Sequence, residues 1–455
     1  MDISALNDEQ KLAVLHEPGS PSAIIAGAGS GKTKVLTTRI GYLIEDKGVT
    51  PKRICGITFT NKAAGEIKER LGLTDEHNCP RVGTIHSLAL SAIRRAPKGF
   101  GLSDKVTPLD DYDQTQMIRR LIEAAKLEEV VNPYLAREKM GYHRARGVGF
   151  VVDYTPDVAA KAAVAHGGYH NLTPEELEIW AEYEKEKMKN SVVDFDDMIH
   201  LVVRRGKTDE RWLGNLQKAF DFLLMDEAQD TNVIQWAFIN MLLPPDNLNM
   251  LCVGDVSQSI YGFNGAEPEI LLNYTKSWRG ATPTLYKLEQ NYRSVPEVVK
   301  LANKIQLYMT DTIPLKMDSY RGRVKKESGK ILLRRASTPR ELAASISEQI
   351  VNRDSSIHYK DIAILVRAGS QVRDIETELV RNRIPYIIRG TMGLLQTEEV
   401  KDILSYMKIA SNPQDFSALC RSIGIPKRGV GDVALRRFHD ASGDFGGDMI
   451  AFLKA

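Results

Sequence analysis

The feature that most constrains the fold of this chain is a glycine-rich turn between a short apolar run and a helix-like stretch. Residues 23–26 are apolar, as in a buried strand, and residues 34–45 place apolar side chains at helical spacing. The turn between them matches the pattern G-x-x-x-x-G-K-[ST] in the looser form that begins with alanine. It consists of Ala26, Gly27, Ala28, Gly29, Ser30, Gly31, Lys32 and Thr33. A strand, such a turn and a helix in succession are typical of a phosphate-binding loop (P-loop) in an α/β fold.

The residue types in this turn suit the binding of a nucleoside triphosphate. Glycines let the backbone N–H groups point at phosphate oxygens, at the positive end of the following helix. The ammonium of Lys32 reaches the β- and γ-phosphates, and the hydroxyl of Thr33 holds Mg²⁺. We therefore expect ATP and Mg²⁺ as cofactors. The turn by itself leaves open a glycine-rich bend that binds no ligand.

A P-loop needs acidic partners on a neighbouring strand, and residues 222–227 supply them. The apolar run 222–225 predicts a buried strand that delivers Asp226 and Glu227 to its carboxyl end, where α/β sheets bind ligands. Asp226 is expected to hold Mg²⁺ through a water, and Glu227 to orient and deprotonate the attacking water. Acidic residues also end strands for solubility alone, so it is their combination with the P-loop that predicts ATP hydrolysis.

Other parts of the chain extend this α/β prediction. The apolar runs 54–58, 249–253 and 362–366 read as strands, and they alternate with helix-like stretches such as 63–71. Continuous apolar runs are typical of parallel strands that are buried on both faces. The region from about 90 to 195 differs, because its helix-like stretches, 113–130 and 173–189, have no clear strand pattern between them. We therefore predict a helical insertion in the first α/β unit.

Composition limits the class of protein. The 455 residues are 43% hydrophobic and 26% charged, as in ordinary globular proteins, and the net charge of +2 is too small to indicate nucleic-acid binding. No run of 18 apolar residues predicts a membrane span, and the N-terminus does not read as a secretory signal. The 4 cysteines lack C-x-x-C spacing, which argues against a disulfide framework and favours a reducing cytoplasm. The basic stretch 320–335 reads as a solvated loop or as a contact to a phosphate backbone.

Further segments follow one another in a fixed order along the chain. Besides Asp226–Asp230 they are Leu6–Gln10, Thr58–Ala64, Gly83–Ser87, Val193–Asp197, Gly254–Tyr261, Gln290–Ser294, Asp361–Arg367, Ile384–Ile403 and Ile425–Gly431. Together with the P-loop they resemble the motifs of the UvrD/Rep/PcrA group of superfamily 1 DNA helicases. The resemblance covers nearly the whole chain.

The resemblance implies roles around the nucleotide. Gln10 would read the adenine edge, Tyr292 would stack on the adenine, and Arg39 would lie near the base. Gln258 would sense the γ-phosphate, and Arg293 would act as an arginine finger that neutralises charge in the transition state. Lys34, directly after the P-loop, would belong to the same nucleotide site.

The resemblance also implies a track for single-stranded DNA. Aromatic faces would come from Phe59, Tyr261 and Phe263, and backbone contacts from Thr84 and His86. Asn61, in the segment that contains Phe59, would contact DNA as well. Other interpretations stay open, because Phe59 and Tyr261 could be core aromatics and His86 a hydrogen-bonded structural histidine.

The implied architecture is a P-loop RecA-like motor domain with a helical insertion, plus an incomplete second RecA-like domain. The expected boundaries are residues 1–90 and 195–288 for the first motor domain, 91–194 for its insertion, 289–390 for the second domain, and 391–455 for the start of a second helical insertion.

The sequence departs from the family pattern in three places. Asn264 stands where the family usually has arginine, and Phe263 where it often has tryptophan. Motifs V and VI have no counterpart, and residues 448–455 read as an interrupted amphipathic helix without a C-cap. We therefore expect either the N-terminal part of a longer helicase or a shortened relative.

The leading expectation is an ATP-dependent DNA helicase that moves 3′ to 5′ on single-stranded DNA and separates 3′-tailed duplex DNA. One alternative is an ATP- and DNA-binding module with weak or no unwinding, acting as a regulator or needing the missing motifs in trans. Another is the ATPase subunit of a helicase–nuclease complex, although no nuclease-like carboxylate cluster is visible.

Overall fold

The computed structural model describes residues 3–72, 78–104, 106–147, 171–389, 398–413, 415–426, 428–431, 434, 437 and 441. The chain divides into two compact units. The first comprises Met1–Gly329 with Ser405–Ala455, and the second comprises Lys330–Leu404. The expected helix over 448–455 lies outside the described residues.

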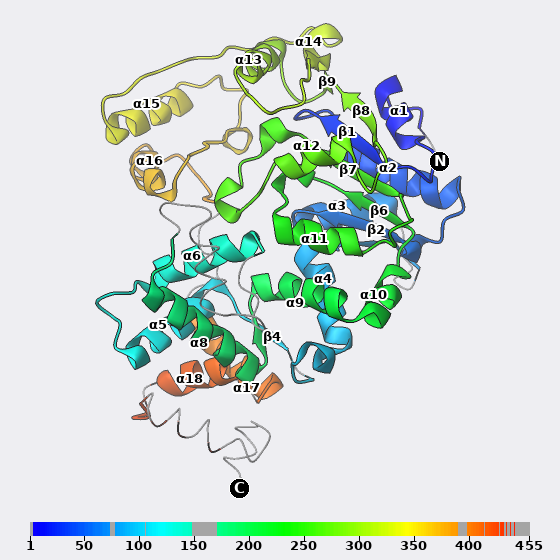
Figure 1. Cartoon of the computed structure of the whole chain (residues 1–455). Coiled ribbons are helices and arrows are strands. Elements are labelled where there is room, and N and C mark those ends of the chain that lie inside the picture. The colour runs from blue at the N-terminus through cyan, green and yellow to red at the C-terminus, as the bar shows by residue number, and fades with distance from the viewer. Residues whose placement is uncertain are drawn as a thin grey trace. The chain divides into compact units, whose positions relative to one another are not determined.

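A six-stranded sheet forms the centre of the first unit (Figure 1). Its strand order is β3-β2-β6-β7-β1-β8, and every neighbouring pair is parallel. The strands are β1 (Ser22–Ala26), β2 (Ile54–Thr58), β3 (Arg81–Thr84), β6 (Phe222–Met225), β7 (Met250–Gly254) and β8 (Thr284–Leu288). The apolar runs predicted as strands in this unit are thus confirmed, as is the α/β class.

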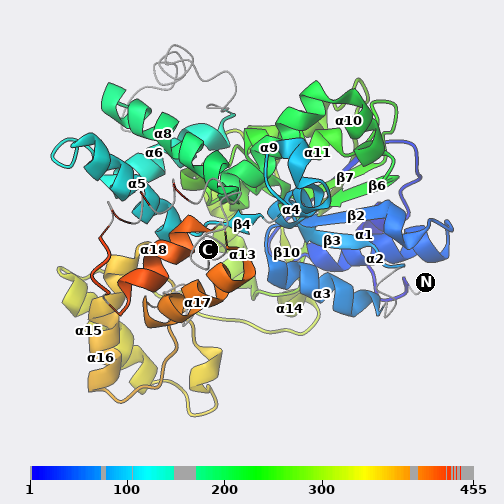
Figure 2. The ribbon, with the colours of Figure 1, turned by 90° about the horizontal axis from the view of Figure 1, so that it is seen from below.

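Helices cover both faces of the sheet (Figure 2). Because successive residues of a strand point to opposite faces, each strand packs against both layers of helices. Ile24 and Leu224 face α1 (Asp8–Val14), α2 (Lys32–Glu45) and α3 (Asn61–Leu71). Ile25 and Leu223 face the opposite layer. That layer contains α4 (Ile85–Arg95), α9 (Phe195–Thr208), α10 (Glu210–Gln217), α11 (Val233–Met241) and α12 (Glu269–Lys276). Burial on both faces explains why these strands are apolar throughout.

The predicted helical insertion is confirmed. Its helices α5 (Asp111–Ala125), α6 (Pro133–Ala145) and α8 (Pro174–Asn190) pack around a core that includes the fully buried Trp180. The helix predicted over 113–130 ends at Ala125, because Lys126 adopts a left-handed conformation with φ of 58°. A two-residue parallel pair, β4 (Thr107–Pro108) with β5 (Val192–Val193), forms where no strand was predicted.

The first unit continues past β8 with smaller elements. They are β9 (Gln290–Asn291), β10 (Asp318–Ser319), α13 (Pro296–Gln306), α14 (Tyr320–Arg323) and, near the C-terminus, α18 (Phe416–Gly424). In the basic stretch 320–335, Arg321 pairs with Glu327 and Arg323 lies 3.5 Å from Asp318. Short 3-10 helices of this unit are η1 (Pro51–Arg53), η2 (Pro97–Phe100), η3 (Ala228–Asp230), η4 (Val256–Gln258) and η5 (Gly262–Asn264), and those of the second unit are η6 (Tyr359–Asp361) and η7 (Gly369–Gln371).

In the second unit, α15 (Pro339–Val351) and α16 (Val372–Arg381) pack through Ile350 and Leu379. The start of α17 (Glu398–Ser411) also belongs to this unit. The prediction of a strand over 362–366 is wrong for the structure as described, since no described segment of this unit pairs with that run. Leu365 is 93% exposed there. An apolar run becomes a strand only where another segment accepts its backbone hydrogen bonds.

Among the described residues, no helix has both the length and the apolar character that crossing a membrane requires.

A cluster of buried ion pairs joins the helical insertion to α9, one of the helices that cover the central sheet. Arg144 on α6 and Lys187 on α8 converge on Asp194 and Asp197 at the start of α9. The Nζ atom of Lys187 lies 2.7 Å from Asp194 Oδ2 and 2.8 Å from Asp197 Oδ2. These side chains are at most 9% exposed, so each charge depends on its partners.

Arg144→Met is therefore predicted to lower the free energy of unfolding by about 3–5 kcal/mol, because it leaves the buried carboxylates with Lys187 as their one remaining cation partner in the cluster. Arg137→Met on the same helix is the matched control. Arg137 pairs at 3.0 Å with Asp111, whose side chain is 74% exposed, so its loss is predicted to change stability by only about 0–1 kcal/mol. Urea unfolding of both variants makes the comparison, and equal losses would contradict a structural role for the cluster.

Candidate functional site

The predicted P-loop joins the carboxyl end of β1 to the N-terminus of α2. Gly29 and Gly31 have φ values of 72° and 87°, a region that glycine enters without strain. A Cβ atom on Gly29 would lie 2.5 Å from the Cβ of Arg293, so this position also lacks room for a side chain. The Ser30 hydroxyl donates to the Gly27 carbonyl at 2.8 Å and braces the turn. The loop thus presents its backbone at the start of a 14-residue helix.

The acidic pair after β6 meets this loop. Lys32 Nζ lies 2.9 Å from Glu227 Oε2 and 3.3 Å from Gln258 Oε1. The Thr33 hydroxyl lies 3.5 Å from Asp226 Oδ2. Lys32 and Glu227 are 195 positions apart in the sequence, yet both lie at the carboxyl edge of the sheet. The structure therefore brings together all five of these predicted residues.

The electrostatics around Asp226 suit a bound cation. Burial, reinforced by the neighbouring Glu227, raises the pKa of Asp226 to about 6, and Lys32 only partly opposes this. The carboxylate of Asp226 and the hydroxyl of Thr33 are hard oxygen donors of the kind that Mg²⁺ takes, together with waters and phosphates.

The side chains expected around the base flank the other side of the loop. Gln10 donates through Nε2 to the Ser30 carbonyl at 2.8 Å and accepts from the Asn7 N–H at 3.1 Å. The Tyr292 hydroxyl accepts from the Asn7 side-chain amide at 2.9 Å. The Tyr292 N–H donates to the Gly29 carbonyl at 2.9 Å. Gln10 and Tyr292 are thus held against the P-loop by hydrogen bonds.

The segment after β8 brings Arg293 to the same loop. Asn291 donates to the Ala28 carbonyl at 2.7 Å and accepts from the N–H of Arg293 at 2.9 Å. Arg293 is exposed, and its guanidinium forms no hydrogen bond or ion pair within the described part of the chain. The cation is therefore available to a ligand on the loop.

Two predicted nucleotide residues have partners in the N-terminal segment. Arg39 is 5% exposed and donates to the Val14 carbonyl at 2.7 Å, and burial lowers its pKa to about 10. Lys34 donates to the Ala5 carbonyl at 2.9 Å. In the structure both side chains fasten this segment to α2, and their contact with a nucleotide stays a prediction.

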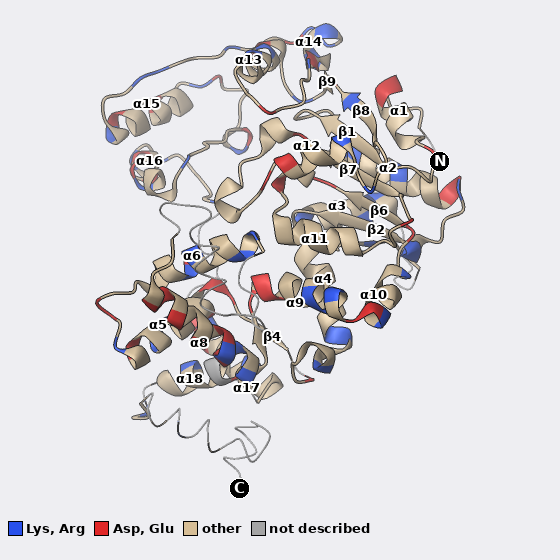
Figure 3. Cartoon of the chain, in the orientation of Figure 1, with Lys and Arg blue, Asp and Glu red and all other residues tan. Residues whose placement is uncertain are grey.

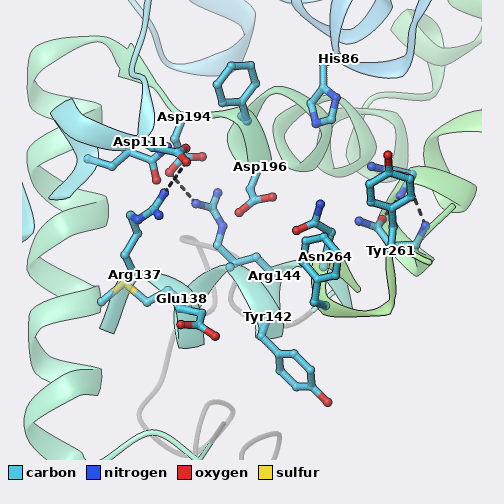
Figure 4. A pocket seen from close by; sticks show the side chains of 18 of the residues that line it. His86, Asp111, Arg137, Glu138, Tyr142, Arg144, Asp194, Asp196, Tyr261 and Asn264 are labelled. Atoms are coloured by element: carbon cyan, nitrogen blue, oxygen red, sulfur yellow. Dashed lines mark hydrogen bonds and ion pairs between the residues drawn. The ribbon is translucent and has the colours of Figure 1, made fainter. Parts of the chain in front are cut away.

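A pocket of about 650 Å³ lies between the central sheet's helices and the insertion (Figure 4). Its lining includes five of the six residues predicted to contact DNA, namely Phe59, Thr84, His86, Tyr261 and Phe263. Asn61, at the first position of α3, is not among the lining residues. The structure therefore gathers most of the predicted DNA residues around one cavity.

Three aromatic residues of this pocket, Phe59, Tyr261 and Phe263, are not buried in a core. The ring centroids of Phe59 and Tyr261 are 4.7 Å apart, and those of Tyr261 and Phe263 are 5.9 Å apart. Phe59 is 39% exposed and Phe263 is 75% exposed. Exposed rings grouped in this way offer stacking faces to planar groups.

His86 and Thr84 lie at the start of α4. Thr84 accepts from the Ser87 N–H at 3.2 Å and caps the helix. His86 packs edge-to-face against Phe195 with centroids 5.8 Å apart, and burial lowers its pKa, so the ring is neutral at pH 7. This placement is compatible with a contact of His86 to the DNA backbone and also with a structural histidine.

Sequence reasoning missed several lining residues. Tyr142, Phe195 and Asp196 reach the pocket from α6 and α9, and Asn264 was noted only as a departure from the family. Burial, strengthened by repulsion from Asp194, raises the pKa of Asp196 to about 7. The segment around Phe195 matched a family motif without an assigned role, and α6 carries no motif at all. Only the packing of the insertion brings these residues to the pocket.

Comparison with known proteins gives matches along the chain. Residues 6–279 match the family described as UvrD/REP helicase N-terminal domain, and residues 286–455 match that described as UvrD-like helicase C-terminal domain.

Curated relatives include the ATP-dependent DNA helicase PcrA of Leuconostoc citreum, which is 34% identical over 442 residues, or 96% of this chain and 57% of the relative. The probable DNA helicase II homolog of Mycoplasma capricolum subsp. capricolum is 31% identical over 444 residues, 96% of this chain and 58% of the relative. PcrA of Staphylococcus epidermidis is 31% identical over 445 residues, with the same two shares. The chain thus spans under three fifths of the length of these relatives.

Asp196→Asn is predicted to stabilise the fold. The pKa of Asp196 is about 7 in the folded chain against 3.8 as its ordinary value, so the folded state binds more protons between these pH values. Ionisation of Asp196 therefore lowers stability progressively as pH rises through this window. Replacement by asparagine removes the charge, and Asp196 forms no hydrogen bond in the described chain that the variant would lose. The gain in the free energy of unfolding is therefore predicted to be absent near pH 4 and complete above pH 7.

We expect a gain on the order of 1–2 kcal/mol at pH 8, measured by urea unfolding across this range of pH. Glu138→Gln makes the same change of charge at an exposed carboxylate of the same pocket and, as a surface substitution, is predicted to change stability by less than about 0.5 kcal/mol. A gain that is the same at pH 4 and pH 8 would contradict the account.

Proposed function

Because this chain belongs to the UvrD/REP helicase family, we propose that it is an ATP-dependent motor on single-stranded DNA. It couples ATP hydrolysis to movement in the 3′-to-5′ direction and to separation of 3′-tailed duplex DNA. The observation that carries the proposal is the contact of Lys32 with Glu227 and Gln258, which joins the P-loop to the segments that follow β6 and β7. The similarity to proteins named as DNA helicases supports it as well.

In the proposed site, residues 26–33 hold the triphosphate and Lys32 moves from Glu227 to the β- and γ-phosphates. Thr33 and Asp226 would hold Mg²⁺, whose positive charge would offset the charge of the phosphates. Glu227, released from Lys32, orients the attacking water and accepts its proton. Gln10 and Tyr292 contact the adenine, and Arg293 neutralises charge that develops on the transferred phosphoryl group.

Gln258 provides a route from the nucleotide to DNA. Its amide accepts from Lys32 and donates to the Ala26 carbonyl at 3.3 Å and to Asp255 at 2.7 Å. Three residues later, Tyr261 begins the aromatic wall of the pocket. A triphosphate that draws Lys32 away would change the partners of Gln258, and through the same short segment it would shift the stacking surface. Stepping along DNA requires that the protein bind DNA with different affinity in the states with and without bound triphosphate.

The second RecA-like domain, proposed for residues 289–390, would close over the nucleotide and carry Arg293. We place the protein in the cytoplasm, where reduced thiols persist, because the buried Cys55 and Cys252 form no disulfide bond.

Lys32→Ala is predicted to reduce DNA-stimulated ATP hydrolysis by on the order of 10²–10³-fold, because the substituted loop loses the cation that binds the phosphates. Lys47→Ala is the control. Lys47 follows the same helix and pairs at the surface with Glu17, so its loss is predicted to leave turnover unchanged. The rate of ATP hydrolysis by both variants is measured as phosphate release with and without single-stranded DNA. Full turnover in Lys32→Ala would refute the proposed site.

A second candidate function is an ATP- and DNA-binding module that does not unwind. It is favoured by one observation on the second unit, in which residues 330–389 contain no strand and Leu333 and Leu365 are 92% and 93% exposed. Without an ordered sheet in that unit, the nucleotide site would lack a rigid body to move against the first motor domain.

Strand-separation assays distinguish the two functions. With ATP and Mg²⁺, the motor is predicted to unwind a duplex that has a 3′ single-stranded tail and to leave a blunt or 5′-tailed duplex intact. A binding module would bind all tailed substrates and hydrolyse ATP without releasing the strand. Unwinding from the 5′ tail alone would contradict the proposed polarity.

A further inference from the structure

We propose that Met317 and Asn303 form a clamp on the P-loop, in which the Met317 side chain fixes the loop at Gly27 and Asn303 holds Met317 there. The affinity for the nucleotide then depends on a segment after α13 that none of the sequence motifs covers. The clamp rests on the proposed binding of ATP at residues 26–33 and adds two positioning residues to that site. All of the residues concerned belong to the first unit.

The space around Gly27, and not its backbone conformation, excludes a side chain at this position. Gly29 and Gly31 have positive φ values, whereas Gly27 does not. A Cβ atom at Gly27 would lie 2.4 Å from Sδ and 2.6 Å from Cε of Met317. Two carbon atoms in favourable contact lie about 3.5–4.0 Å apart, so the Met317 thioether occupies the place that a side chain at Gly27 would need.

One side chain holds the backbone of Met317. The Asn303 amide donates to the Met317 carbonyl at 2.8 Å, and its oxygen accepts from the Met317 N–H at 3.1 Å. Asparagine satisfies both backbone groups because its amide carries a donor and an acceptor. The two residues after Met317 form β10, which pairs with β9. Met317 is therefore fixed on both sides of the contact with Gly27.

The helix that carries Asn303 turns one face to the rest of the unit. Val299 is buried, and Asn303 and Gln306 are half-buried, at the spacing of neighbouring positions on one side of a helix. The Gln306 amide donates to the Ser257 hydroxyl of η4 at 3.2 Å. The lysines of α13, coloured blue in Figure 3, are exposed. This face of α13 thus contacts the segment after β7 and, through Asn303, the clamp.

The entry of the P-loop is held from several directions. The Ser30 hydroxyl donates to the Gly27 carbonyl, and the Gln258 amide donates to the Ala26 carbonyl. Met317 adds an apolar contact on the side of Gly27 where a side chain would stand. A loop that is held in its binding shape before the nucleotide arrives loses less conformational freedom on binding. Loss of the clamp is therefore predicted to weaken nucleotide binding.

The test is a double-mutant cycle between Gly27 and Met317, measured as the dissociation constant of a fluorescent, non-hydrolysable ATP analogue with Mg²⁺. Met317→Ala is predicted to weaken binding about three- to tenfold. Met317→Leu, which conserves most of the side-chain volume, is predicted to restore most of that affinity. Gly27→Ala is predicted to weaken binding in the otherwise wild-type chain and to have no further effect in Met317→Ala, because the added methyl group then meets no side chain.

Gly29→Ala is the matched control for the cycle. The φ of 72° at Gly29 and the nearby Cβ of Arg293 disfavour alanine there whether or not Met317 is present. Its effect is therefore predicted to add to that of Met317→Ala. Asn303→Ala tests the other half of the clamp at a half-buried position, where water can replace the lost hydrogen bonds and the fold is not threatened. It is predicted to weaken binding in the same direction as Met317→Ala.

Two results would overturn the inference. One is wild-type affinity in both Met317→Ala and Asn303→Ala, and the other is additive losses in the double variant of Gly27 and Met317. Thermal unfolding of each variant checks that the chain is folded. In both cases the wild-type chain would still bind the analogue, so the proposed function would stay intact. Failure of the wild-type chain to bind it would contradict the proposed function, and the clamp with it.

Discussion

The 2.9 Å ion pair between Lys32 and Glu227 depends on the whole central sheet. The two residues follow β1 and β6, which are not neighbours, because β7 lies between them. Only a parallel sheet with helices on both faces brings the carboxyl ends of these strands to one edge. In the structure the opposite charges of Lys32 and Glu227 pair with each other. A bound triphosphate would have to separate them and would thereby free the carboxylate for catalysis.

The same sheet edge also places the aromatic pocket. β7 leads into Gln258 and then into the aromatic residues of η5, while α6 reaches the other side from the insertion. The buried pairing of Arg144 and Lys187 with the start of α9 holds that insertion in place. The nucleotide site and the pocket are therefore both supported by the central sheet and the helices that pack on it.

Local patterns in the sequence were enough to predict the nucleotide site. The P-loop, the acidic pair and the central strands follow from short segments whose chemistry or apolar character is complete within a few residues. The pocket was predicted only on its aromatic side, since Tyr142 comes from α6 of the insertion, which carries no motif, and Asp196 stands at the start of α9 in a motif-like segment to which no role was assigned. The strand predicted over 362–366 failed for a related reason, because strand formation depends on a partner segment that the run itself does not specify. The resemblance implied a place near the base for Arg39, yet its hydrogen bond to the Val14 carbonyl depends on the packing of the N-terminal segment against α2.

The most direct test of the account is a crystal structure of the chain with Mg²⁺, a non-hydrolysable ATP analogue and a short single-stranded oligonucleotide. We predict the triphosphate over residues 26–33, with Lys32 moved from Glu227 to the phosphates and the metal held by Thr33 and Asp226. A base should lie against the aromatic side of the pocket. Nucleotide bound elsewhere, with Lys32 and Glu227 still paired, would contradict the central claim.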